Sequence, residues 1–163
     1  MASGQQHDRA TWWLAVPLAL LCWPWLGVAG VATAAGAFLF GGLWLSPDLD
    51  TLSRPSQRWG ALRWLWWPYR RWISHRAVWS HAPLIGTAGR LLYLGAWLAL
   101  LSSLLQPFGS PGPQEIGSGL LRLWEHQRSL CLVALAGVEA SCWLHLIQDG
   151  DPMPRWRRRR RRR

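Results

Sequence analysis

The side chains best suited to catalysis or metal binding in this chain are imidazoles and carboxylates that form four short clusters. They contain four of the five histidines and every aspartate except Asp151: His7 and Asp8, Asp48 and Asp50, His75 and His81, and His145 and Asp149. Neutral imidazoles and carboxylates are the ligands that suit Zn, Mn, Fe or Mg. The clusters therefore predict a site for a divalent metal ion, and the ligand types leave its identity open among these four.

The number of candidate ligands bears on the kind of metal site. Eight candidates exceed the four ligands of a structural tetrahedral zinc. We expect one or two ions, and a two-metal site is the natural arrangement, because paired ions stabilise both the attacking and the leaving oxygen in phosphoester hydrolysis. Some of the eight could instead contact a metal ligand without touching the metal, since a metal-bound imidazole usually donates its other N–H to a carboxylate. The sequence leaves the division between these two roles open.

Two further residues are candidates for substrate contact and proton transfer. Arg76 follows His75 and could hold a phosphate through two parallel hydrogen bonds, or it could extend its charge to lipid headgroups. Glu139 shares a helix face with Asp149, where it could act as a general base, as a partner of the third helix or as a carboxylate behind the ligands. The alternative for Glu139 is an ion pair with Arg90 inside the protein.

Long apolar stretches must position the clusters. Residues 12–45 carry no charge, and as one helix they would reach about 51 Å, well beyond a hydrocarbon core of about 30 Å. Because Pro24 and glycines lie near the middle, the stretch predicts two antiparallel helices. The helices that we expect cover about 12–27, 30–46, 83–108 and 129–148. Each cluster lies at an end of one of these helices.

The distribution of arginine predicts how the helices cross a membrane. All 18 basic residues are arginine; one precedes the first helix, six lie within residues 51–81 and eight within 155–163, against two between 122 and 128. The positive-inside rule then places both termini and the central segment in the cytoplasm, which requires four crossings. We predict an all-α integral membrane bundle of about four transmembrane helices in the cell inner membrane, with its metal site facing the cytoplasm.

Two segments outside these helices are rich in arginine. Residues 58–73 interleave tryptophan with arginine, which is typical of a membrane interface; a stacking surface for single-stranded nucleic acid is the alternative. Residues 155–163 contain eight of the arginines that give the chain its net charge of +10. We expect them to form a disordered tail after a helical membrane domain of residues 1–154, able to bind anionic lipid headgroups or nucleic acid.

Other readings of the chain are weaker. Residues 9–35 could be a secretory signal, but the apolar stretch continues to Leu45, which favours a membrane hairpin. The three cysteines lie in apolar stretches without metal-ligand spacing, so we expect no disulfide framework. A nucleotide cofactor is not expected, because the chain contains no phosphate-binding glycine-rich loop and no dinucleotide fingerprint.

Several motifs, taken in order, resemble a bacterial family of uncharacterised membrane metal-binding proteins. They are His7-Asp8, Phe40 to Leu43, Ser46 to Asp50, Arg58 to Gly60, Leu62 to Trp64, Pro68 to Arg70, His75-Arg76, Ser80 to Thr87, and His145 with Asp149. The resemblance covers nearly everything except residues 106–128 and the arginine tail. The family is similar in turn to LexA-binding, inner-membrane-associated proteins described as metal-dependent hydrolases.

The resemblance implies a helical membrane protein with bound metal and, further, hydrolase activity. Gln6 and Trp79 depart from the residues usual in the family, a threonine and a small residue, and neither change removes a candidate ligand. We expect a metal-dependent hydrolase acting on a phosphoester or a lipid headgroup at the cytoplasmic face. The alternative is a non-catalytic membrane protein in which the cluster fastens the helix ends together and the arginine tail recruits a partner. The oligomeric state stays open.

Overall fold

The computed structural model describes residues 2–150, which form helices joined by short turns and contain no strand. This confirms the all-α class. The elements, with η for 3-10 helices, are α1 (Gly4–Leu20), α2 (Trp23–Leu43), η1 (Pro47–Asp50), α3 (Arg54–Arg58), η2 (Gly60–Trp66), α4 (Trp67–Trp72), α5 (Val78–His81), α6 (Ile85–Leu105), η3 (Gln106–Phe108), α7 (Pro113–His126) and α8 (Arg128–Gln148). The arginine tail lies outside the described residues.

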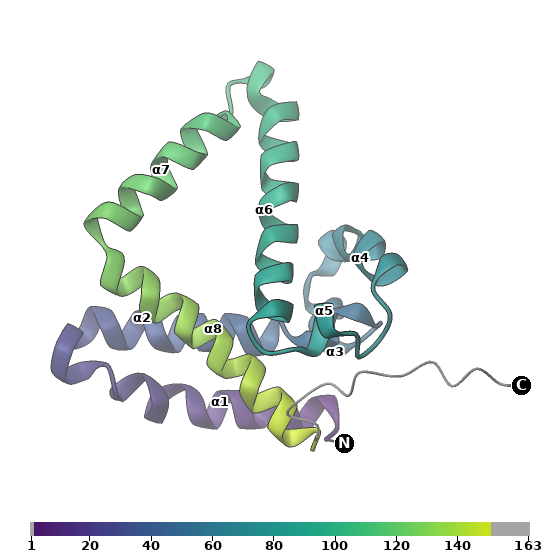
Figure 1. Cartoon of the computed structure of the whole chain (residues 1–163), viewed down its shortest axis with the longest axis vertical. Coiled ribbons are helices and arrows are strands. Elements are labelled where there is room, and N and C mark those ends of the chain that lie inside the picture. Colours follow the sequence, from purple (N-terminus) through teal and green to yellow (C-terminus); the bar gives the residue numbers. More distant parts are fainter. Residues whose placement is uncertain (1, 151–163) are drawn as a thin grey trace, which may run out of the picture.

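The first two helices form an antiparallel hairpin (Figure 1). The chain reverses after Leu20 and bends again at Gly27, whose φ of +56° is readily adopted only by glycine. The hairpin is as expected, but the reversal comes earlier than the expected break between residues 27 and 30, where the structure has only the bend at Gly27. The first helix begins at Gly4, earlier than expected, because Ser3 and Gln6 form a capping box. His7 therefore lies on a helix.

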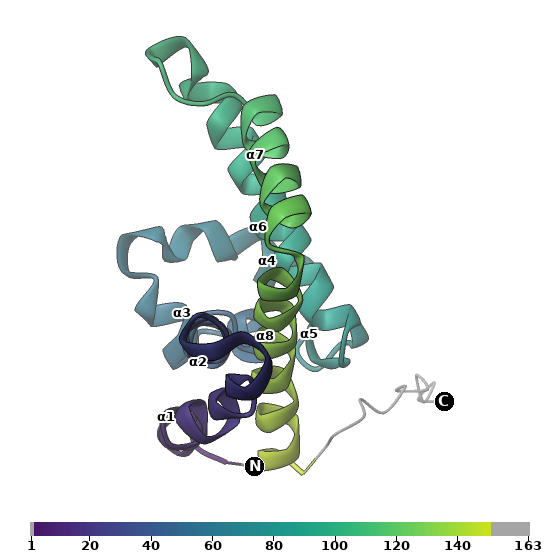
Figure 2. The ribbon, with the colours of Figure 1, turned by 90° about the vertical axis from the view of Figure 1, so that its left-hand side faces the viewer.

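Helix α8 packs across α2 at glycine contacts. A Cβ on Gly41 would lie 2.9 Å from Val138 Cα, and a Cβ on Gly137 would lie 3.0 Å from the carbonyl oxygen of Ala34. Both distances are too short for a side chain, so glycine permits the two backbones to approach closely. The contact brings the last turn of α8 beside the start of α1, as Figure 2 shows.

Helix α6 does not join the other long helices in a bundle. It runs crosswise to α2, and α6, α7 and α8 outline an open triangle (Figures 1 and 2). Its N-terminal half packs instead on the central segment, where Tyr93 contacts Trp66 and Trp97 contacts Trp64. The predicted bundle of about four transmembrane helices is therefore not confirmed, because these aromatic contacts direct α6 away from α2.

Three helical stretches are long and apolar enough to cross a membrane: Trp23–Asp50, Ile85–Phe108 and Arg128–Gln148. Helix α1, which has only 17 residues, is not among them, so four crossings are not confirmed. The tryptophan- and arginine-rich segment divides in two. Trp66 and Tyr69 are buried in the core with Leu45 and Leu49, whereas the outer tryptophans Trp64, Trp67 and Trp72 are exposed.

Candidate metal centre

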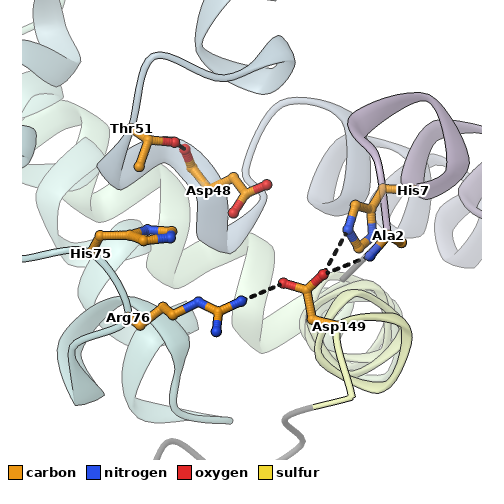
Figure 3. Close-up of a pocket in the computed structure, with 7 residues that line it drawn as sticks. All are labelled: Ala2, His7, Asp48, Thr51, His75, Arg76 and Asp149. Atoms are coloured by element: carbon orange, nitrogen blue, oxygen red, sulfur yellow. Dashed lines mark hydrogen bonds and ion pairs between the residues drawn. The ribbon is translucent and has the colours of Figure 1, made fainter.

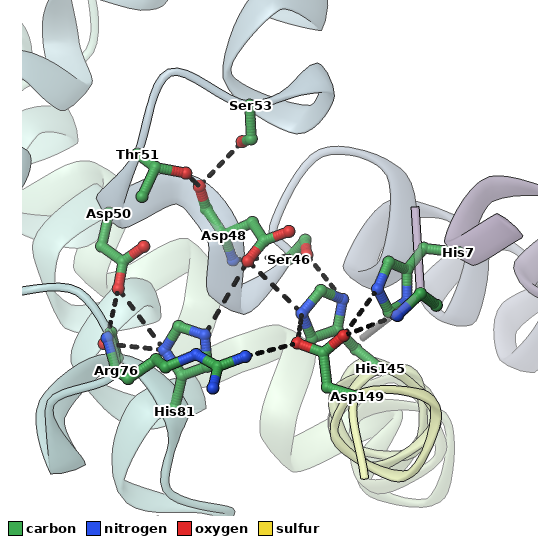
Figure 4. A network of polar contacts seen from close by, with 12 residues as sticks. His7, Ser46, Asp48, Asp50, Thr51, Ser53, Arg76, His81, His145 and Asp149 are labelled. Atoms are coloured by element: carbon green, nitrogen blue, oxygen red, sulfur yellow. Dashed lines mark hydrogen bonds and ion pairs between the residues drawn. The ribbon is translucent and has the colours of Figure 1, made fainter. Parts of the chain in front are cut away.

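The predicted clusters meet at one place, where four elements end or begin (Figure 4). His7 lies in the first turns of α1, and His145 and Asp149 lie at the last turn of α8. The other ligand candidates come from η1, which follows α2, and from α5 with the turn that precedes it. The hydroxyl of Ser46 caps η1, so that Asp48 and Asp50 leave the helix end in a fixed turn.

Two buried imidazole nitrogens point toward the same carboxylate oxygen. His145 Nε2 lies 3.5 Å and His81 Nε2 lies 3.8 Å from Asp48 Oδ1. Neither nitrogen has a hydrogen-bond partner within residues 2–150, although both atoms are buried. Buried polar atoms without partners are uncommon, and a bound ion is one recognised reason for them. The donor set, two imidazoles and one carboxylate, fits a divalent metal.

The other nitrogen of each ring, Nδ1, contacts a neighbouring polar side chain. His145 Nδ1 lies 3.4 Å from Ser46 Oγ. His81 Nδ1 lies 2.9 Å from Ser80 Oγ and 3.4 Å from Asp50 Oδ2. Hydrogen bonds of this kind fix the tautomer and the orientation of a metal-binding imidazole. The arrangement therefore presents both Nε2 atoms to the space beside Asp48.

Two further groups flank the central one and share its histidines. The first combines His145 with His7 and Asp149, and the second combines His81 with Asp50 and His75. His7 Nε2 lies 3.2 Å from Asp149 Oδ1, and His75 Nδ1 lies 3.0 Å from Asp50 Oδ1. Within each group one donor atom from each residue lies within 4.8 Å of the others. Seven of the eight candidate ligands are thus brought together.

Asp8 is the candidate that the structure places elsewhere. Its Oδ2 accepts hydrogen bonds from Arg54 Nε at 2.8 Å and Arg58 Nη2 at 2.5 Å. Arg58 also donates to the carbonyl oxygen of Leu43 at the end of α2. Asp8 belongs to none of the three groups, and its contacts fasten α1 to α3 and α2.

Glu139 is also separated from the three groups. Its Oε1 accepts the backbone N–H of Leu84 at 2.9 Å, at a position where the φ of Leu84 is +61°. The ion pair with Arg90 that was the alternative for Glu139 is not formed. Arg90 donates instead to the Ser80 carbonyl, to Thr87 Oγ1 and to Cys142 Sγ. Glu139 therefore anchors the start of α6 to α8.

A cavity of about 210 Å³ opens beside the central group (Figure 3). Its walls are Ala2, His7, Asp48, Thr51, His75, Arg76 and Asp149. Arg76 Nη2 lies 3.4 Å from Asp149 Oδ2, and the Arg76 backbone N–H donates to Asp50 Oδ2 at 3.2 Å. The φ of Arg76 is +63°, a conformation that is costly for a residue with a side chain and that recurs at binding sites.

The carboxylates change the protonation of His81. Burial, the largest single influence, lowers the pKa of this imidazole, but hydrogen bonds and charge from Asp48 and Asp50 together outweigh it and raise the pKa above 6.5. His81 therefore keeps its proton more readily than a free histidine while no metal is bound. A metal ion at Nε2 would have to displace a proton.

The residues that hold the rings were assigned no role on the sequence alone. Ser46 and Ser80 occur in the motifs quoted above, and both are buried beside a candidate ligand. Gln148, whose Oε1 lies 2.8 Å from His7 Nδ1, was not singled out. The sequence signal for the serines is their position: Ser46 directly precedes the turn that carries Asp48 and Asp50, and Ser80 directly precedes His81.

Comparison with known proteins agrees with a metal site. The family described as "Uncharacterized metal-binding protein (DUF2227)" matches residues 2–160 of this chain. An uncharacterised protein of Aquifex aeolicus is 47% identical over 58 residues, a stretch that spans 35% of this chain and 40% of that protein. No solved structure matches the chain.

Proposed function

The chain belongs to this family of uncharacterised metal-binding proteins, and we propose that it is a membrane metal-dependent hydrolase that cleaves a phosphoester or a lipid headgroup at the cytoplasmic face. One observation carries the proposal. The buried Nε2 atoms of His81 and His145 have no hydrogen-bond partner in the described part of the chain and converge on Asp48, beside an open cavity into which Arg76 extends.

We assign the metal to Asp48, His81 and His145. Three protein ligands leave a coordination position for water or substrate, as is usual in catalytic sites. Asp50, Ser46 and Ser80 would orient the two imidazoles through their Nδ1 atoms without touching the metal. His7 and Asp149 offer donors for a second ion next to the first, and elemental analysis decides between one ion and two.

The charges around the cavity explain why an anionic substrate would need the metal. Asp48 and Asp149 line the cavity, and Arg76 is the arginine that faces them. A phosphate would be repelled by the two carboxylates unless a cation neutralised them. When bound, a divalent metal supplies that charge and activates a water for attack on the phosphoester. Arg76 would then hold the phosphate oxygens.

The cavity offers His7 as the residue to accept a proton. With its Nδ1 donating to Gln148 Oε1, His7 would accept the proton at Nε2 when no second ion occupies this nitrogen, and Asp149 beside it would stabilise the imidazolium. Glu139, the proton acceptor expected from the sequence, lies six residues before His145, about 9 Å along the helix, and is engaged by Leu84. We therefore transfer this role to His7.

The size of the cavity limits the substrate class. A cavity of about 210 Å³ is smaller than the roughly 300–1,000 Å³ that encloses a whole drug-sized ligand. It would admit a phosphoryl group and leave the remainder of the substrate outside. A lipid headgroup phosphate meets this condition, since its acyl chains would stay in the bilayer. The three apolar stretches support the membrane location, and the sequence resemblance to inner-membrane hydrolases supports the reaction class.

A non-catalytic metal site is the second candidate, because the same groups join α1, η1, α5 and α8. In that case every coordination position would be filled by protein, whereas a catalytic site keeps one open. Metal-dependent turnover distinguishes a catalytic site from a structural one. The structural role would give bound metal and a higher melting temperature without metal-dependent hydrolysis.

The test uses the full chain purified in detergent. We expect about one or two divalent ions per chain and metal-dependent hydrolysis of a phosphoester panel that includes phospholipid vesicles. His145→Ala and Asp48→Asn should lose metal and turnover together, whereas Arg76→Ala should keep the metal and lose turnover. His126→Ala, which changes an exposed histidine of α7, is the matched control. Absence of metal from the wild type, or full metal content in both ligand variants, would overturn the site.

A further inference from the structure

The carbonyl oxygen of Ser80 is enclosed by the first turns of α6. Arg90 Nη1 donates to it at 2.6 Å. One helical turn earlier, a Cβ on Gly86 would lie 2.7 Å from the same oxygen, closer than a side chain can approach. Ser80 and Arg90 are both 0% exposed. Two residues of α6 on one helix face therefore fix the position of this single carbonyl.

Arg90 is an unusual residue for this position. No carboxylate lies within 4 Å of its guanidinium among residues 2–150, and its acceptors are a carbonyl, a hydroxyl and a thiol. Burying a charge without an opposite charge is expensive. The shortest of the three hydrogen bonds is the one to the Ser80 carbonyl. The costly burial of Arg90 therefore goes together with a hydrogen bond that holds Ser80 in place.

Ser80 in turn controls the neighbouring ligand. Its carbonyl belongs to the peptide unit that leads to His81, so the orientation of this planar unit sets the direction in which the His81 side chain leaves the backbone. Its hydroxyl lies 2.9 Å from His81 Nδ1. The main chain and the ring of His81 therefore both depend on where Ser80 sits.

We propose that Gly86 and Arg90 are positioning residues of the metal site: by holding the Ser80 carbonyl against α6, they direct His81 Nε2 toward Asp48 and His145. The inference rests on the proposed metal site, but it concerns residues that no candidate ligand group contains. The inference also assigns α6 a role in shaping the metal site, although most of that helix is exposed.

The test measures Co²⁺ binding to the full chain in detergent, by affinity and by visible absorption, which reports coordination geometry. Arg90→Met and Gly86→Ala should each weaken Co²⁺ affinity by about 10- to 100-fold, as loss of a residue behind a metal ligand usually does, and should change the spectrum. Arg90→Lys, which keeps a donor, should recover part of both.

Two control variants separate positioning from general destabilisation. Gly95→Ala adds the same methyl group to the same helix, where a Cβ meets nothing within 4 Å, and Arg122→Met removes an exposed arginine of α7. Both should bind Co²⁺ like the wild type. A purely structural role for Gly86 and Arg90 would lower the melting temperature and leave the spectrum of the folded protein unchanged.

The outcomes distinguish this inference from the proposed function. If the wild type binds no Co²⁺, the metal site itself is overturned and this inference with it. If the wild type binds and the folded Gly86→Ala variant binds equally well with the same spectrum, only the positioning role is overturned. Should Arg90→Met not fold, the comparison of Gly86→Ala with Gly95→Ala decides.

Discussion

The imidazole of His7 stacks on the imidazole of His145, with 4.0 Å between ring centroids and 21° between ring planes. The contact joins the first turns of α1 to the last turn of α8, from nearly opposite ends of the described chain. His7 therefore has two separable properties, a stacking surface and a nitrogen that faces Asp149. One substitution can remove the second property while keeping much of the first.

His7→Phe should keep the stack and lose the nitrogen, whereas His7→Ala should lose both. We expect His7→Ala to destabilise the metal-free protein by about 1 kcal/mol more than His7→Phe, the usual contribution of an aromatic pair beyond its buried area. Both variants should lose turnover if His7 accepts the proton. Thermal unfolding without metal and hydrolysis with metal measure the two effects. Equal stability of the two variants would contradict the stacking contribution.

Asp8→Asn should leave the metal content unchanged and lower stability. The substitution removes the charge that two arginines share, Arg54 half exposed and Arg58 largely covered. We expect a loss of roughly 1–2 kcal/mol, because the cost of unpairing the more buried arginine is reduced by solvent around the other. Chemical denaturation and elemental analysis of the folded variant provide the measurement. Loss of metal from folded Asp8→Asn would make Asp8 a ligand after all.

The metal site could be anticipated because it depends on where helices end. Apolar stretches, proline, glycine and clustered arginine mark the helix ends in the sequence, and ligands that lie at helix ends on one side must be near one another. Asp8 lies at the same helix end but outside the three groups. Its neighbour His7 points toward α8, whereas Asp8 lies one residue further around α1, and periodicity alone does not say which face meets which partner.

The packing of α6 could not be anticipated. The sequence shows that residues 85–105 are apolar, but an apolar helix is equally suited to a neighbouring helix and to lipid. Its direction is set by specific contacts with η2 and α4, in which Tyr93 meets Trp66. Trp66 itself was grouped with the interfacial tryptophans, because a buried and an interfacial tryptophan look alike in a sequence.

The raised pKa of His81 predicts how pH affects metal binding. The interaction of protonated His81 with Asp48 and Asp50 stabilises the metal-free fold fully below the unfolded pKa of 6.5, and that stabilisation is lost as pH rises through the higher folded pKa. Metal requires the neutral imidazole, so metal affinity should rise across the same interval. The difference in melting temperature between metal-loaded and metal-free protein should therefore widen as pH rises above 6.5 through the folded pKa of His81.

His81→Gln is the variant that tests this pH dependence. Glutamine cannot carry the titrating proton, so the change of the metal-free melting temperature above pH 6.5 should become smaller. His126→Gln, on exposed α7, should leave the pH dependence as in the wild type. A metal-free wild type whose stability increases as pH rises through this interval would show that the carboxylates do not hold a proton on His81.

Glu139→Gln should retain turnover, because a glutamine carbonyl can still accept the N–H of Leu84. Glu139→Ala should destabilise the protein by about 0.5–1.5 kcal/mol, the usual net contribution of one hydrogen bond, because it removes the acceptor of an exposed backbone N–H at a residue whose φ is already unfavourable. Hydrolysis rates and denaturation curves of the two variants make the comparison. A large loss of turnover in folded Glu139→Gln, with metal retained, would restore Glu139 as the proton acceptor.

Arg76 combines an unfavourable backbone conformation with a charged side chain beside the cavity, and two substitutions separate these properties. At φ +63° glycine is favoured over any residue with a Cβ, so Arg76→Gly should be more stable than Arg76→Ala by about 1 kcal/mol. Both variants lack the guanidinium, so both should lose affinity for inorganic phosphate in the metal-loaded protein to the same extent. Denaturation and direct binding of inorganic phosphate to the metal-loaded protein measure the two properties. If phosphate affinity instead followed stability across the two variants, Arg76 would be a conformational residue of the turn before α5 and not the group that contacts the substrate.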